Sequence, residues 1–164
     1  MKKMTMCLTL LLLSWPMMSG AAEQGADGVY LAHADKPVAS VYDQVYKSLE
    51  DARFFVVFEP NIGANLANFA EKWGDDYNRN NLSEIRSMIF CNGWYANKVS
   101  NLDPNMLGFC PLHITLIERE GKTTVLFNRP SAIAQKSPAK DLLLEIETEV
   151  IAAIQKGLEK DVAK

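Results

Sequence analysis

The sequence predicts an α+β fold in which helices cover one face of a single antiparallel or mixed β-sheet. Two neighbouring segments alternate apolar and polar residues around a two-residue turn, which is the pattern of a β-hairpin. Two other segments carry apolar residues at helical spacing. The elements follow in the order strand, helix, strand, helix, strands, helix, and this order favours a sheet covered on one side.

The first 22 residues are typical of a secretory signal peptide. Lys2 and Lys3 are followed by an uncharged apolar run, and small residues precede the polar segment. The apolar centre is shorter than the about 20 residues that a membrane-spanning helix needs. We therefore expect cleavage after residue 21 or 22 and a periplasmic or secreted bacterial protein. A disordered leader over residues 23–28 and one α+β domain over residues 29–162 would follow.

A strand and an amphipathic helix are expected first. Residues 29–33 can form a short strand. Asp35 then supplies an N-cap and Pro37 a first-turn proline. Apolar side chains recur at helical spacing over residues 38–49, which predicts a helix with one buried face.

A second strand and a second helix are expected next. The run from Arg53 to Glu59 is continuous, aromatic and β-branched, so we expect a strand that is buried on both faces or central in the sheet. Pro60 stops this strand. A short helix over residues 62–73 is ended by Gly74, before a polar surface loop over residues 75–83.

The clearest local signal is a hairpin in the second half of the chain. Residues 84–91 form a strand, and a short helix from Trp94 to Leu102 separates it from the hairpin. Residues 112–119 and 122–128 are the two hairpin strands, joined by Glu120-Gly121.

The register of this hairpin is well specified by its apolar residues. The two-residue loop places Ile114 opposite Phe127 and Leu116 opposite Val125, all on one apolar side. A slip of one residue would move these side chains to the other face of the sheet.

A long helix that begins at Ser137-Pro138 closes the chain. Glu145, Glu147 and Glu149 are expected to face water. The apolar stripe that we expect to be buried consists of Leu142, Leu143, Ile146, Val150, Ile151, Ile154 and Leu158.

Two cysteines, Cys91 and Cys110, remain after removal of the signal peptide. Export to an oxidising compartment and an even count favour a disulfide between them, which would stabilise the fold by about 3 kcal/mol. A redox-active or ligand-holding pair and two unpaired buried thiols are the alternatives. Catalytic disulfide exchange normally uses cysteines two residues apart at a helix N-terminus, and this spacing differs.

A metal site in this chain would draw on Cys91, Cys110, His113 and His33. These residue types suit copper or zinc. However, Cys110 and His113 are three positions apart and point to opposite faces of a regular strand. We therefore predict no metal site, and no motif identifies haem or any other cofactor.

No motif in the sequence identifies a reaction or a catalytic residue. There is no Gly-x-Ser-x-Gly sequence, and only two histidines could serve as a base. The residues that we expect to bind a ligand are Trp94 and Tyr95 at the start of the short helix, His113, and Arg129, whose guanidinium could bind an anion.

Charge limits the class of partner. The chain has a net charge of −3, which argues against nucleic acid or an anionic membrane surface, because both select basic patches. No later segment is long and apolar enough to span a membrane. We expect a soluble protein whose partner is a small ligand or another periplasmic protein.

Short blocks between residues 90 and 130 carry a resemblance to a known family. They are Phe90-Cys91-Asn92, Tyr95-Ala96, Asp103-Pro104, Phe109-Cys110-Pro111-Leu112, Ile114-Thr115-Leu116, Ile117-Glu118, Gly121-Lys122, Val125 and Arg129-Pro130. On these residues the chain resembles domain-of-unknown-function family 302, in its exported branch with two cysteines. The resemblance implies a TATA-binding-protein-like β-α-β(4)-α fold and, for some members, dimers. It implies no catalytic residues.

We therefore expect an exported accessory or binding protein, with Cys91 and Cys110 near its functional site and a redox or metal link as one option. One alternative is a thiol-dependent enzyme that uses a Cys110 thiolate. Another is a purely structural homo-oligomer, such as a homodimer, joined through the sheet face that carries Thr115, Ile117 and Leu126.

Overall fold

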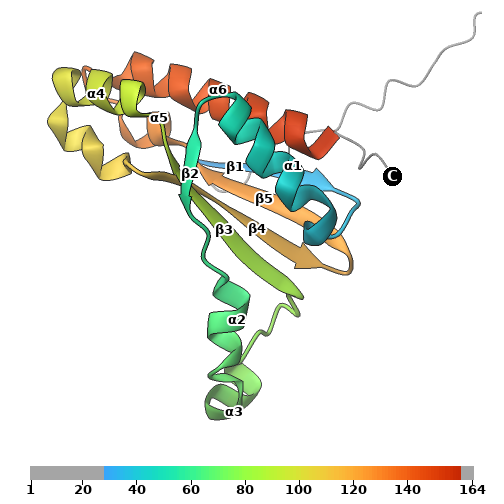
Figure 1. Cartoon of the computed structure of the whole chain (residues 1–164). Helices are drawn as coiled ribbons and strands as arrows, with labels where there is room; N and C mark the ends of the chain where they lie inside the picture. The colour runs from blue at the N-terminus through green and yellow to red at the C-terminus, as the bar shows by residue number, and fades with distance from the viewer. Residues whose placement is uncertain (1–27, 160–164) are drawn as a thin grey trace, which may run out of the picture.

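The computed structural model describes residues 28–159, which form a five-stranded antiparallel sheet with helices on one face (Figure 1). The strand order in the sheet is β1-β5-β4-β3-β2. The predicted signal peptide and nearly all of the predicted leader lie outside the described residues. The strands are β1 (Val29–Ala34), β2 (Phe55–Phe58), β3 (Glu84–Cys91), β4 (Leu112–Arg119) and β5 (Lys122–Asn128).

Two long helices, α1 (Val38–Asp51) and α6 (Lys140–Glu159), lie together across one face of the sheet (Figure 1). Among the described residues, no helix combines the length and apolar character needed to cross a membrane. The shorter helices are α2 (Ile62–Ala67), α3 (Ala70–Trp73), α4 (Gly93–Leu102) and α5 (Pro130–Ile133), with 3₁₀ turns η1 (Gly74–Asp76) and η2 (Pro104–Phe109). The strands and the two long helices follow the order β-α-β(4)-α, which confirms the predicted fold class.

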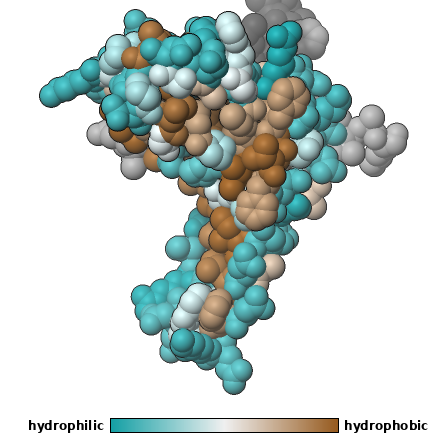
Figure 2. All heavy atoms as spheres, turned by 60° about the vertical axis from the view of Figure 1, so that its left-hand side comes forward, coloured by the Kyte–Doolittle hydropathy of each residue, from teal (hydrophilic) through white to brown (hydrophobic). Residues whose placement is uncertain are grey.

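The segment between β2 and β3 leaves the body of the molecule. We call residues 61–83 the arm; it contains α2, α3 and η1 and projects away from the sheet (Figure 1). The helix expected over residues 62–73 is interrupted at Asn68 and Phe69, and neither α2 nor α3 has a buried residue. Figure 2 shows a band of apolar residues that runs from the body down the arm.

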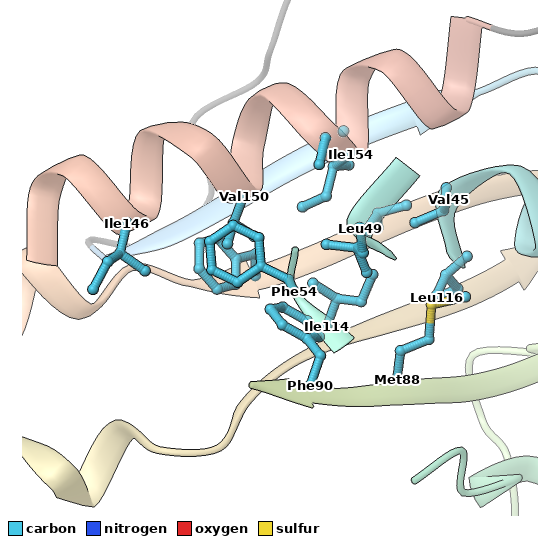
Figure 3. Close-up of a cluster of buried hydrophobic side chains, with 14 of the residues drawn as sticks. Val45, Leu49, Phe54, Met88, Phe90, Ile114, Leu116, Ile146, Val150 and Ile154 are labelled. Carbon is cyan, nitrogen blue, oxygen red and sulfur yellow. The ribbon is translucent and has the colours of Figure 1, made fainter. Parts of the chain in front are cut away.

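The hydrophobic core lies between the sheet and the two long helices, with side chains from α1, the strands and α6 meeting in one layer (Figure 3). Each fully buried apolar side chain contributes about 1.5–3 kcal/mol through its removal from water. The helices touch closely at Gly157 of α6, where a Cβ atom would lie 2.6 Å from the Cα atom of Val45. The buried residues labelled in the figure are Val45, Leu49, Phe54, Met88, Phe90, Ile114, Leu116, Ile146, Val150 and Ile154.

The hairpin of β4 and β5 has the predicted strands, turn and register. Ile114 pairs with Phe127 and Leu116 with Val125, and all four side chains are buried. Glu120 and Gly121 both have positive φ angles, 54° and 71°. A two-residue turn that matches the twist of a hairpin requires such angles.

The prediction of a central or doubly buried strand over residues 53–59 is wrong. β2 is the edge strand of the sheet, and Phe55, Val57 and Phe58 are 54%, 64% and 60% exposed. Only Phe54, just before the strand, is fully buried. A continuous apolar run indicates a strand that is buried on both faces, but in β2 only Val56 packs against the core.

Asp35 does not cap α1 as the sequence predicted. The N-cap is Pro37, which makes no side-chain cap hydrogen bond. The backbone N–H of Val38 instead donates to Oε2 of Glu118 at 2.8 Å, and Asp35 forms an ion pair with Lys122 at 2.9 Å. A carboxylate of β4, distant in sequence, therefore replaces the local cap.

Candidate functional site

The four residues expected to bind a ligand lie in three different places. Trp94 and Tyr95 line a groove beside α1 and α6. His113 lines a separate depression near the start of β4. Arg129 is bonded to Glu147 of α6. The structure therefore brings together only the two aromatic residues.

Asn92 positions Trp94 and Tyr95. Its side-chain oxygen accepts hydrogen bonds from the backbone N–H groups of Trp94 and Tyr95 at 3.0 and 3.1 Å, which is the N-cap arrangement of a helix. This cap starts α4 directly after β3. Trp94 is left 68% exposed, whereas Tyr95 is buried in the core.

Tyr95 is fixed by its ring and by its hydroxyl group. The ring stacks on Phe54 with the centroids 6.1 Å apart. The hydroxyl lies 2.8 Å from a carboxylate oxygen of Glu145 and equally far from one of Glu149. Burial raises the pKa of Tyr95, and the two carboxylates raise it further. The phenol is therefore held as a protonated hydrogen-bond donor.

We call the cavity of about 480 Å³ beside Trp94 the Trp94 groove. It lies between α1, the start of β2, the start of α4, and α6, and Ala152 and Ala153 of α6 form part of its wall. Its volume falls within the roughly 300–1,000 Å³ that is typical of small-molecule sites. A larger groove of about 670 Å³ lies between the arm and β3, remote from the aromatic pair and the cysteines.

Two cations that line the Trp94 groove have no ion-pair partner among the described residues. Of the groove's two acidic residues, Asp51 pairs with Lys47 at 3.1 Å, whereas Glu149 keeps its negative charge and accepts a hydrogen bond from the neutral Tyr95 hydroxyl. Within residues 28–159, its two cations, Arg53 and Lys156, form no ion pair. The groove therefore offers two cations that are available to bind an anion.

Ser48 of α1 lines the same groove and has an unsatisfied hydroxyl group. The residue is 1% exposed, and its Oγ atom makes no hydrogen bond to any described residue. Buried hydroxyl groups in proteins nearly always have a partner. Sequence reasoning missed Ser48, Arg53 and Lys156, because three separate elements bring them together.

Cys91 and Cys110 are free thiols in the structure, so the predicted disulfide is absent. The β3–β4 ladder ends at the pair Phe90 and Leu112, and Cys110 follows η2 outside β4. No strand pairing therefore aligns Cys110 with Cys91.

Both cysteines nevertheless border one small cavity of about 20 Å³, which adjoins the Trp94 groove through Asn92 and Tyr95. Apolar side chains, including Phe54, form much of the cavity wall. Burial raises the pKa of the Cys110 thiol, and Cys91 raises it further. Cys110 is therefore held as a neutral thiol.

We expect iodoacetamide to alkylate Cys110 more slowly than free cysteine at pH 7, with a rate that rises above about pH 8.5. Mass spectrometry of a Cys91→Ser variant measures this rate. Because folding raises the pKa of Cys110, the folded protein favours the neutral thiol. The contribution of this thiol to the free energy of unfolding is complete below about pH 8.5 and is lost as pH rises further. Alkylation at pH 7 as fast as that of free cysteine would contradict the raised pKa.

The histidines and cysteines considered for a metal site line separate pockets. His33 and His113 border two different depressions, and neither borders the cavity of the cysteines. Nδ1 of His33 lies 3.0 Å from the hydroxyl of Thr124. Within the part of the chain that is described, no three His, Cys, Asp or Glu side chains are arranged to hold a metal ion.

Arg129 forms an ion pair with the buried carboxylate of Glu147. Nε of Arg129 donates to Oε1 of Glu147 at 2.7 Å, and the hydroxyl and backbone N–H of Ser131 donate to Oε2 at 2.5 and 3.2 Å. Glu147 is 1% exposed, so the prediction that it faces water is wrong. The segment around α5 packs on α6 and covers this carboxylate, and Arg129 is occupied in holding the two together.

Comparison with known proteins supports the fold. The sequence model of DUF302, a domain of unknown function, matches residues 30–160. Among solved structures, the chain is similar to an uncharacterized conserved DUF302 protein from Bacillus stearothermophilus, with 19% identity and a TM-score of 0.68. The match covers 80% of this chain and 98% of that one. No curated protein matches the chain.

Proposed function

We propose that this chain, which belongs to the DUF302 family of domains of unknown function, is an exported binding protein for a small anionic ligand. The observation that carries the proposal is the position of two unpaired cations, Arg53 and Lys156, in one groove with the exposed indole of Trp94. The signal peptide predicted from the first 22 residues supports export.

The ligand class follows from the chemistry of the Trp94 groove. A planar guanidinium such as that of Arg53 binds the two oxygens of a carboxylate, sulfonate or phosphate group well. The indole of Trp94 offers a flat apolar surface on which an aromatic or unsaturated group can stack. A flat organic anion fits both groups.

The two thiols have a supporting role in this proposal. They lie in the cavity behind the groove, and the raised pKa of Cys110 keeps its thiol neutral. Neutral thiols add a polarisable apolar wall behind Tyr95 rather than a charge. The same raised pKa disfavours an enzyme with a Cys110 thiolate, because the thiolate is the nucleophile. The binding role is therefore the better supported of the two.

Isothermal titration calorimetry with 2-naphthoate tests the proposal, with neutral 2-naphthamide as the matched control probe. We expect naphthoate to bind with a dissociation constant below about 1 mM and the amide at least about tenfold more weakly. Arg53→Gln and Lys156→Gln should each weaken naphthoate binding roughly 10- to 100-fold, which corresponds to the loss of a charged hydrogen bond.

Lys136→Gln is the control variant, because Lys136 is exposed and does not line the groove. This variant should bind naphthoate as the unaltered protein does. Equal affinity for naphthoate and naphthamide would contradict an anion site. Unchanged binding by both groove variants would show that the ligand sits elsewhere.

A further inference from the structure

A second groove, apart from the Trp94 groove, lies between the arm and the start of β3. Its volume of about 670 Å³ falls within the roughly 300–1,000 Å³ that is typical of small-molecule sites. Residues of α2, α3, η1, the loop after η1 and the first part of β3 line it, and none of them lines the Trp94 groove. We call this cavity the arm groove.

Backbone hydrogen bonds attach the arm to the sheet at both of its ends. Directly before the arm, the carbonyl oxygen of Pro60 accepts the N–H of Ser87 in β3 at 3.0 Å. At the last residue of the arm, the N–H of Ser83 donates to the carbonyl oxygen of Glu118 in β4 at 2.9 Å. The arm, which projects from the body (Figure 1), is therefore tied to the same sheet that forms the opposite wall of the groove.

The two walls of the arm groove are also held locally. α2 lies so close to β3 that a Cβ atom on Gly63 would be 3.2 Å from the backbone nitrogen of Ile85. In the loop after η1, the side chain of Asn78 donates to the carbonyl oxygen of Leu82 and accepts the N–H of the same residue, both at 2.9 Å. A site whose walls are already in place loses less entropy when a ligand binds.

An indole forms a flat apolar part of the groove wall. Trp73 lines the groove and is 40% exposed. Its ring stacks on that of Phe69 with the centroids 5.0 Å apart, and this contact holds the indole in place. The face of an aromatic ring is the negative part of its quadrupole, so it attracts the weakly positive hydrogens of C–H groups. The groove therefore offers a surface on which a ligand can stack a flat face of C–H groups.

The charges of the lining disfavour an anionic ligand. Asp76 and Arg79 form an ion pair, so the arginine of the groove already has a carboxylate partner. Glu84 adds a second carboxylate, which leaves more negative than positive charge in the lining. An anion would be repelled here, whereas the Trp94 groove presents the cations Arg53 and Lys156.

Amide side chains offer hydrogen bonds to a polar ligand without charge. Asn61, Asn78 and Asn80 all line the groove, and each amide has two N–H donors and an acceptor oxygen. The oxygen of Asn61 accepts the N–H of Ala64 at 2.8 Å, and this bond does not use its two donors. A wholly apolar ligand would separate these amides from water and leave them without partners. Hydroxyl groups, which both donate and accept, match them.

We propose that the arm groove binds a neutral oligosaccharide of about two or three sugar rings. A sugar ring combines the two features that the groove requires. One face of the ring carries C–H groups that can stack on the indole of Trp73, and the hydroxyl groups at its edge can bond the amides of the loop and of α2. This site is independent of the anion-binding function proposed for the Trp94 groove, because the two grooves share no lining residue.

Isothermal titration calorimetry with cellotriose and with N,N′,N″-triacetylchitotriose tests the proposal on the purified protein. We expect at least one of these neutral sugars to bind with a dissociation constant below about 1 mM, and anionic trigalacturonate to bind at least about tenfold more weakly. Trp73→Ala should weaken sugar binding at least about 30-fold. Trp73→Phe keeps a flat ring and should weaken it less than about fivefold. Asn80→Ala should weaken it roughly 3- to 10-fold, as expected for one hydrogen bond.

Phe55→Ala is the matched control, because Phe55 is an exposed aromatic residue that does not line the arm groove, and this variant should bind sugar as the unaltered protein does. Circular dichroism checks that each variant is folded. The proposal is overturned if neither neutral sugar binds, if trigalacturonate binds as tightly as they do, or if Phe55→Ala weakens binding as much as Trp73→Ala. Displacement of the bound sugar by 2-naphthoate would also overturn it, because a single site would then hold both ligands.

Discussion

Replacing Arg129 by methionine is expected to lower the free energy of unfolding by about 3–5 kcal/mol. Methionine preserves most of the apolar stem but removes the guanidinium that bonds to Glu147. The carboxylate of Glu147 is 1% exposed and would keep only its hydrogen bonds from Ser131. Urea denaturation followed by circular dichroism measures the loss.

A second variant separates the effect of the stranded Glu147 charge on stability from the effect of lost packing at Arg129. Adding Glu147→Gln to Arg129→Met removes the stranded charge while keeping an acceptor for Ser131, so the double variant should recover a large part of the stability. Lys136→Met is the control at an exposed position. A loss below about 1 kcal/mol in Arg129→Met would show that the ion pair is not needed to hold the segment around α5 against α6.

Local patterns were sufficient for most of the fold. The hairpin was predictable because its turn and its apolar alternation both lie within residues 112–128 and agree on one register. The stripe of α1 was predictable for the same reason, since residues at helical spacing bury one face. Both depend on neighbours in sequence, where periodicity carries the information.

Features that depend on distant partners were not predictable in this way. The carboxylate that receives the N–H of Val38 comes from Glu118, 80 positions away. The sequence pattern predicted that Glu147 faces water, but the segment around Arg129 covers it in the structure. The disulfide expected between Cys91 and Cys110 is not formed, because the spacing of two cysteines in the sequence does not determine how the fold places them.

In the candidate site too, local features were predictable and features that depend on distant residues were not. Trp94 and Tyr95 were expected from the sequence to bind a ligand because they sit together at the start of a helix, and both line the same groove. The two cations of the groove were not predicted, because Arg53 precedes β2 and Lys156 lies near the end of α6. Apolar character also proved ambiguous, since Phe54 is fully buried while its neighbour Phe55 is exposed on the edge of the sheet.

Replacing Phe54 by alanine is expected to lower the free energy of unfolding by about 3–5 kcal/mol, because the side chain is fully buried and leaves a cavity. Its ring contacts that of Phe90 edge-on at 5.9 Å and stacks on that of Tyr95. It also lines the cavity of Cys91 and Cys110, so its removal should open that cavity to water. Thermal and urea denaturation measure the stability.

Alkylation of Cys110 provides a second measurement on the same variant. Water that enters the enlarged cavity should lower the pKa of the thiol toward its ordinary value and speed its reaction with iodoacetamide. Phe54→Leu fills more of the space and should cost less than Phe54→Ala, while Ile133→Ala on the surface should cost about 0.5 kcal/mol or less. If Phe54→Ala lost stability without faster alkylation of Cys110, something other than burial beside Phe54 would be protecting the thiol.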